Sequence, residues 1–141
     1  MRTKTIAYWT TTGLVALAFI AGGLTDAAGS PMVLETMKHL GYPAYFAMLL
    51  GAWKLLGGAA ILSPRFPLLK EWAYAGMFFD LTGAAVSHAA SGDGASKIIT
   101  PLVLLGLTVA SWSLRPATRK LEGAAPGVQE TRRAEPARVA A

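Results

Sequence analysis

Two charged side chains, Lys54 and Asp80, interrupt two otherwise apolar stretches of the chain, residues 44–63 and 72–90. Each charge lies thirteen residues from Pro67, in the short basic segment that joins the two stretches. If the stretches are antiparallel helices, the ammonium and the carboxylate lie at the same depth. A charge in the middle of a bilayer costs about 2.5–3.5 kcal/mol, so the matched spacing favours an ion pair. Two roles remain open for this pair: a polar floor for a ligand or proton, or a structural link between helices.

Three further polar residues are candidates near one end of these helices. Ser87 and His88 follow Asp80 by about two helical turns, and Ser87 lies closer to the face of Asp80. Asp26 follows the first apolar stretch, and we expect it at the same rim as His88, where the two side chains would hydrogen-bond. A histidine there would change its charge near neutral pH. The candidate ligand-binding residues are therefore Lys54, Asp80, Ser87, His88 and Asp26, and two histidines without any cysteine predict no metal site.

The composition indicates a membrane protein. Of 141 residues, 53% are hydrophobic and only 15% are charged, against about 25% in an average soluble domain. Four apolar stretches are each long enough to cross a hydrocarbon core of about 30 Å as a helix. We therefore predict an all-α fold, a polytopic four-helix bundle in residues 1–114, with spans at about residues 6–24, 44–63, 72–90 and 97–114.

A short amphipathic helix is expected between the first two spans. Ser30 can cap it, Pro31 suits its first turn, and Gly41 can end it. This helix would lie on the membrane surface or pack across the mouth of the bundle. After the last span, residues 115–141 are rich in Ala, Gly, Pro, Arg and Glu and contain few large apolar residues. They predict a disordered tail.

The net charge of +5 comes mainly from basic residues at one side of the predicted bundle. They lie before the first span, between the second and third spans, and after the fourth. This distribution follows the positive-inside rule and predicts that both termini lie in the cytoplasm. The expected partners of these charges are the headgroups of membrane lipids and not nucleic acid.

Several short motifs resemble the DoxX-like family. They comprise His39-Leu40-Gly41-Tyr42-Pro43, the segment from Pro64 to Gly76, Phe78-Phe79-Asp80-Leu81-Thr82-Gly83-Ala84 and Ser87-His88. The resemblance covers about residues 5–116. It implies a four-helix integral protein of the bacterial inner membrane, and some relatives are parts of quinone-linked membrane oxidoreductase complexes.

Three functions follow from these observations. The first is a subunit that binds a quinone or another lipophilic ligand and serves a redox partner protein. An autonomous enzyme is not expected, because the chain has no cysteine and no evident cofactor motif. The alternatives are an accessory or scaffold protein without a ligand, and a small proton-coupled exporter. A second copy of the chain is a further expected partner.

Overall fold

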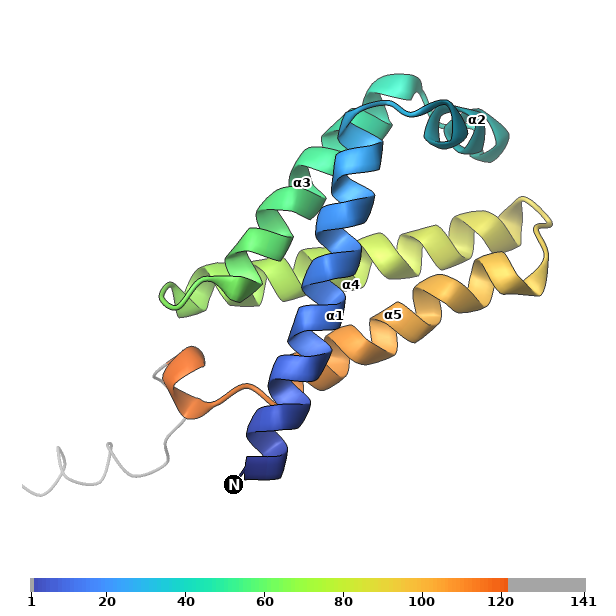
Figure 1. The fold of residues 1–141 in the computed structure, drawn as a ribbon. Coiled ribbons are helices and arrows are strands. Elements are labelled where there is room, and N and C mark those ends of the chain that lie inside the picture. The colour runs from blue at the N-terminus through green and yellow to red at the C-terminus, as the bar shows by residue number, and fades with distance from the viewer. Residues whose placement is uncertain (1, 122–141) are drawn as a thin grey trace, which may run out of the picture.

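The computed structural model describes residues 2–121, and this part of the chain folds into helices without any strand (Figure 1). The all-α prediction is confirmed. Within residues 2–121, five α-helices and one short 3-10 helix follow one another: α1 (Arg2–Ala27), α2 (Pro31–Leu40), α3 (Ala44–Leu62), α4 (Pro67–Ala90), α5 (Ala95–Ser113) and η1 (Ala117–Arg119). The main difference from the predicted bounds is that α4 begins five residues before the predicted span. Pro67 lies in its first turn, where the missing N–H group of a proline costs no hydrogen bond within the helix.

Helices α1 and α3 pack closely because glycines line their contact. An added Cβ at Gly51 would lie 2.8 Å from both the Cα of Ala27 and the carbonyl oxygen of Gly23. Gly58 allows a similar approach to Ile20. In a membrane the hydrophobic effect does not drive helices together, and small residues let the helix backbones approach closely enough to pack. The contact brings the end of α1 next to the middle of α3.

Helices α3 and α4 diverge from the short loop that joins them, and α2 lies near the open end between them (Figure 1). Phe66, directly before α4, takes up a left-handed conformation with φ 63°. At the far end, α4 returns into α5 through a turn in which Gly92 has φ 71°. Two positive-φ glycines also flank α2, Gly29 with φ 59° and Gly41 with φ 81°.

The core lies where α1, α3, α4 and α5 meet. Its buried apolar residues are Val15, Ala16, Phe19, Ile61, Tyr74, Met77 and Leu81. Beside them, the Ser111 hydroxyl lies 2.6 Å from the Thr12 hydroxyl and 2.7 Å from the Tyr74 hydroxyl. Buried hydroxyls satisfy one another here, so the polar groups of three helices specify how α1, α4 and α5 pack.

In the part of the chain that the structure describes, three helices, α1, α3 and α5, are long and apolar enough to cross a membrane. The exterior is also apolar: Leu17, Trp53 and Phe79 are each more than 60% exposed. Large apolar side chains on the outside are typical of a protein whose surface contacts lipid. Helix α4 is long enough at 24 residues, but it is not among these three helices.

The segment predicted to begin a disordered tail is folded in its first residues. Arg115 is only 4% exposed, and its Nη2 donates a hydrogen bond to the Glu71 carboxylate at 2.7 Å. Its guanidinium also lies 5.0 Å from the centre of the Tyr74 ring. Arg119 donates to the Tyr8 hydroxyl at 3.2 Å. These contacts with α1 and α4 order the chain after α5, while the prediction for residues 122–141 lies outside the described residues.

Candidate functional site

One ammonium group faces two carboxylates at the meeting point of α1, α3 and α4. The Nζ atom of Lys54 donates a hydrogen bond to Oδ2 of Asp26 at 2.7 Å, and it lies 3.9 Å from Oδ2 of Asp80. We call Asp26, Lys54 and Asp80 the charged cluster. The predicted neighbours Lys54 and Asp80 are indeed brought together, but the hydrogen bond goes to Asp26. The close contact of α1 with Gly51, one turn before Lys54, places Asp26 there.

The expected hydrogen bond between Asp26 and His88 is not formed. Asp26 binds Lys54 instead, and Nδ1 of His88 lies 2.7 Å from Oδ2 of Asp93. Asp93 belongs to the turn between α4 and α5, and its neighbours Gly92 and Gly94 indicate by residue type only a turn. Its position five residues after His88, just past the end of α4, was the available signal for this contact.

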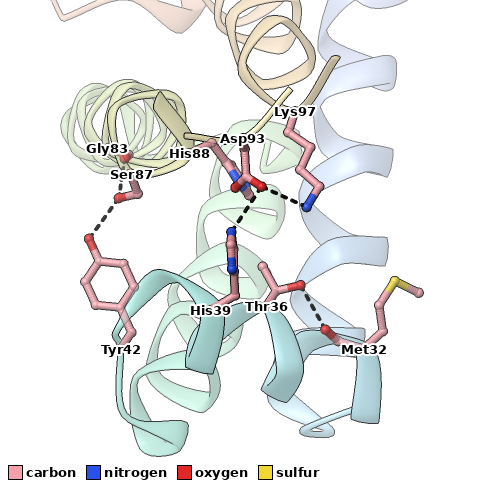
Figure 2. Close-up of polar contacts among 9 residues, drawn as sticks. All are labelled: Met32, Thr36, His39, Tyr42, Gly83, Ser87, His88, Asp93 and Lys97. Carbon is pink, nitrogen blue, oxygen red and sulfur yellow. Dashed lines mark hydrogen bonds and ion pairs between the residues drawn. The ribbon is translucent and has the colours of Figure 1, made fainter. Parts of the chain in front are cut away.

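The Asp93 carboxylate contacts side chains from three different helices (Figure 2). Besides His88 of α4, Nε2 of His39 in α2 lies 3.0 Å from its carboxylate, and Nζ of Lys97 in α5 donates at 3.1 Å. The hydrogen bonds with His88, Lys97 and His39 outweigh the effect of burial and lower the pKa of Asp93 to about 2. Its carboxylate therefore joins α2 to the turn between α4 and α5. Among the described residues, no group of three or more metal-binding side chains could hold a metal ion.

A second contact joins the end of α2 to α4. The Tyr42 hydroxyl lies 2.8 Å from the Ser87 hydroxyl, which itself donates to the carbonyl oxygen of Gly83 at 2.8 Å (Figure 2). Because the serine hydrogen is committed to Gly83, the tyrosine is the donor of this bond. Ser87 therefore holds the chain just after α2 against α4.

A cavity of about 800 Å³, which we call the main cavity, lies between α2, α3 and α4. All five candidate residues from the sequence line it: Asp26, Lys54, Asp80, Ser87 and His88. The rest of its wall is largely apolar and includes Met37 and Leu40 of α2, and Trp53, Trp72 and Phe79. A cavity of this size and polarity suits a small lipophilic molecule, for which protein pockets usually measure about 300–1,000 Å³.

A second cavity of about 440 Å³ adjoins the charged cluster from the side of α5. It shares Lys54, Asp80, Ala84 and His88 with the main cavity. Its other lining residues are Leu81, Ser96, Lys97, Thr100, Pro101 and Leu104. Residues of α5 with hydroxyl and ammonium groups therefore line a space that also reaches Asp80.

This arrangement can hold a molecule with a polar head and an apolar body. The Lys54 ammonium has three hydrogens and commits one to Asp26, so it can donate to a ligand carbonyl. The Asp80 carboxylate can accept from a ligand hydroxyl. The apolar wall would bury the remainder of the ligand, which contributes about 25 cal/mol for each Å² removed from water.

The comparison with protein families gives one match. The DoxX-like family matches residues 10–111, which include α2, α3, α4 and most of α1 and α5. No curated protein and no solved structure matches the chain.

Proposed function

Because the chain belongs to the DoxX-like family, we propose that it is a multi-pass membrane protein that binds a quinone or another lipophilic molecule in the main cavity. In this proposal it serves a membrane redox system as a ligand-binding subunit, and a partner protein supplies the electron transfer. The main cavity is the observation that carries the proposal: an apolar space of about 800 Å³ with Lys54 and Asp80 in its wall. A quinone ring would accept a hydrogen bond from Lys54, and its tail would contact the apolar wall.

The proposed membrane arrangement has four spans, with α4 as the fourth beside α1, α3 and α5. The charge of Asp80 makes the insertion of α4 into the membrane less favourable, but the nearby ammonium of Lys54 in α3 compensates part of this cost. Helix α2 would lie at one membrane surface. The basic residues before α1, between α3 and α4, and after α5 would lie in the cytoplasm, as the positive-inside rule requires in a bacterial inner membrane.

Tryptophan fluorescence tests the proposal directly. Trp53 and Trp72 line the main cavity, whereas Trp9 and Trp112 do not. A short-tailed quinone added to the detergent-purified protein should quench the fluorescence saturably. The double variant Trp53→Phe/Trp72→Phe should lose the saturable part, because the remaining tryptophans lie outside the cavity. Quenching that rises without saturation, equally in both proteins, would mean that the quinone only dissolves in the detergent.

A scaffold without a ligand is the second candidate, and one observation favours it. The hydrogen bond between Lys54 and Asp26 satisfies both charges within the protein. Mass spectrometry of the protein purified in mild detergent separates the two candidates, since a stoichiometric quinone would support the first and bulk lipid alone the second. One kind of proton-coupled exporter uses a free carboxylate in its first span. Here the α1 carboxylate, Asp26, accepts a hydrogen bond from Lys54, which argues against this function.

A further inference from the structure

The charges in the wall of the main cavity do not balance. Two carboxylates, Asp26 and Asp80, face a single ammonium, that of Lys54. The ammonium makes its hydrogen bond with Asp26, and its distance of 3.9 Å to Asp80 exceeds hydrogen-bonding range. Within residues 2–121, the Asp80 carboxylate receives no hydrogen bond at all. The cavity therefore presents an acceptor with unused capacity and, counted as ionised groups, one excess negative charge.

Asp80 also lies between two spaces of different character. On one side is the apolar main cavity, and on the other is the second cavity with Ser96, Lys97 and Thr100 in its wall. Ionised groups within membrane proteins typically face such polar cavities or one another. Asp80 can therefore be reached from both cavities, and it can present an oxygen to a ligand in the main cavity.

We propose that the main cavity selects a lipophilic molecule whose head group donates a hydrogen bond, as a hydroxyl or an ammonium does, to Asp80. This inference rests on the proposed function and narrows its ligand to molecules with a donor head group, which among quinones is the reduced hydroquinone form. A donor head group satisfies the free acceptor, and an ammonium also neutralises the excess charge. A carboxylate head group would instead place a third negative charge beside one ammonium, and an uncompensated charge in this setting is costly.

The apolar part of the ligand has a place along α4. From Asp80 toward the start of the helix, the cavity wall continues through Met77, Gly76, Ala73 and Trp72 to Leu69. At 1.5 Å per residue this wall is about 16 Å long, which accommodates an unbranched alkyl chain of about twelve carbons.

Three probes with one common twelve-carbon tail test the inference: dodecylamine, dodecanol and dodecanoate. Native mass spectrometry of the full chain in detergent measures the apparent Kd of each. We expect dodecylamine to bind at least about tenfold more tightly than dodecanoate, with dodecanol between them. In Asp80→Asn the preference for the amine over the carboxylate should fall to less than about threefold. The control is Glu35→Gln, the same chemical change at an exposed α2 residue outside both cavities, which should keep the preference.

The outcomes separate this inference from the proposed function. Equal binding of dodecylamine and dodecanoate to the wild-type protein overturns the inference but leaves a lipophilic-ligand cavity. A preference that survives in Asp80→Asn also overturns it, because another group must then select the head. If none of the probes binds, the lipophilic-ligand cavity is itself rejected. The comparison of probes in the wild-type protein needs no variant, so it decides the matter even if Asp80→Asn does not fold.

Discussion

Replacing Gly51 with alanine should force α1 and α3 apart, because no space remains for a methyl group between them. The new Cβ would lie 2.8 Å from the Cα of Ala27 and the carbonyl oxygen of Gly23, and closer still to the amide nitrogen of Ala27. Ordinary contacts begin at 3.4 Å, and these neighbours are backbone atoms that no side-chain rotation can move. The helices must therefore separate by at least about 0.6 Å, and overpacking of this kind costs about 1–3 kcal/mol.

Alanine also favours a helix over glycine by up to about 1 kcal/mol, so the expected net loss for Gly51→Ala is about 0–2 kcal/mol relative to the wild-type protein. The matched controls are Gly13→Ala and Gly106→Ala, where an added Cβ meets nothing within 4 Å. Both should be as stable as the wild-type protein or slightly more stable. The measurement is unfolding by sodium dodecyl sulfate in mixed micelles, followed by far-UV circular dichroism. The reasoning is refuted if Gly51→Ala unfolds at the same midpoint as Gly13→Ala.

Three further perturbations test the polar contacts. Lys54→Leu should lower the free energy of unfolding by about 3–5 kcal/mol, because the carboxylates of Asp26 and Asp80 then have no positive charge beside them. Changing all three residues to leucine should lower it less. Detergent unfolding in which the triple variant is less stable than Lys54→Leu would contradict this. The pKa of Asp93 is lowered from 3.8 to about 2, so its ionised form stabilises the fold above about pH 4, and this contribution disappears as the pH falls from about 4 to 2. The stability difference between the wild-type protein and Asp93→Asn should therefore shrink over that range, and a constant difference would show that the carboxylate charge does not matter. Ser111→Ala should lower the free energy of unfolding by about 1–3 kcal/mol, because two buried hydroxyls lose their partner; an unchanged unfolding midpoint would argue against the network.

The pairing of Lys54 with Asp80 could be predicted because it depends on a simple count along two antiparallel helices. The role of Asp26 could not, because it depends on how α1 crosses α3. The small residues Ala47, Gly51 and Gly58 of α3 are typical of a close helix contact, but they do not show that Ala27 of α1 meets Gly51. A crossing point is a tertiary property, and no spacing within one helix reveals it.

The network around Asp93 was missed for a different reason. A Gly-Asp-Gly segment is typical of a turn, and this turn chemistry accounted for the residue without any further partner. His39, by contrast, reaches Asp93 only because the chain after α2 returns to α4. The folded start of the predicted tail has a similar cause, since Arg115 is ordered by Glu71, 44 residues earlier in the sequence.

The order of the charges along the chain has a consequence for how the protein is made. In the proposed membrane arrangement, α1 enters first with Asp26 near its end, α3 follows with Lys54, and α4 brings Asp80 last. Each new charge thus meets an opposite charge that synthesis has already delivered. Helix α4 is not among the helices apolar enough to cross a membrane by composition, so Lys54 should assist its insertion. Glycosylation mapping of the nascent chain should show α4 across the membrane in a smaller fraction of Lys54→Leu chains than of wild-type chains.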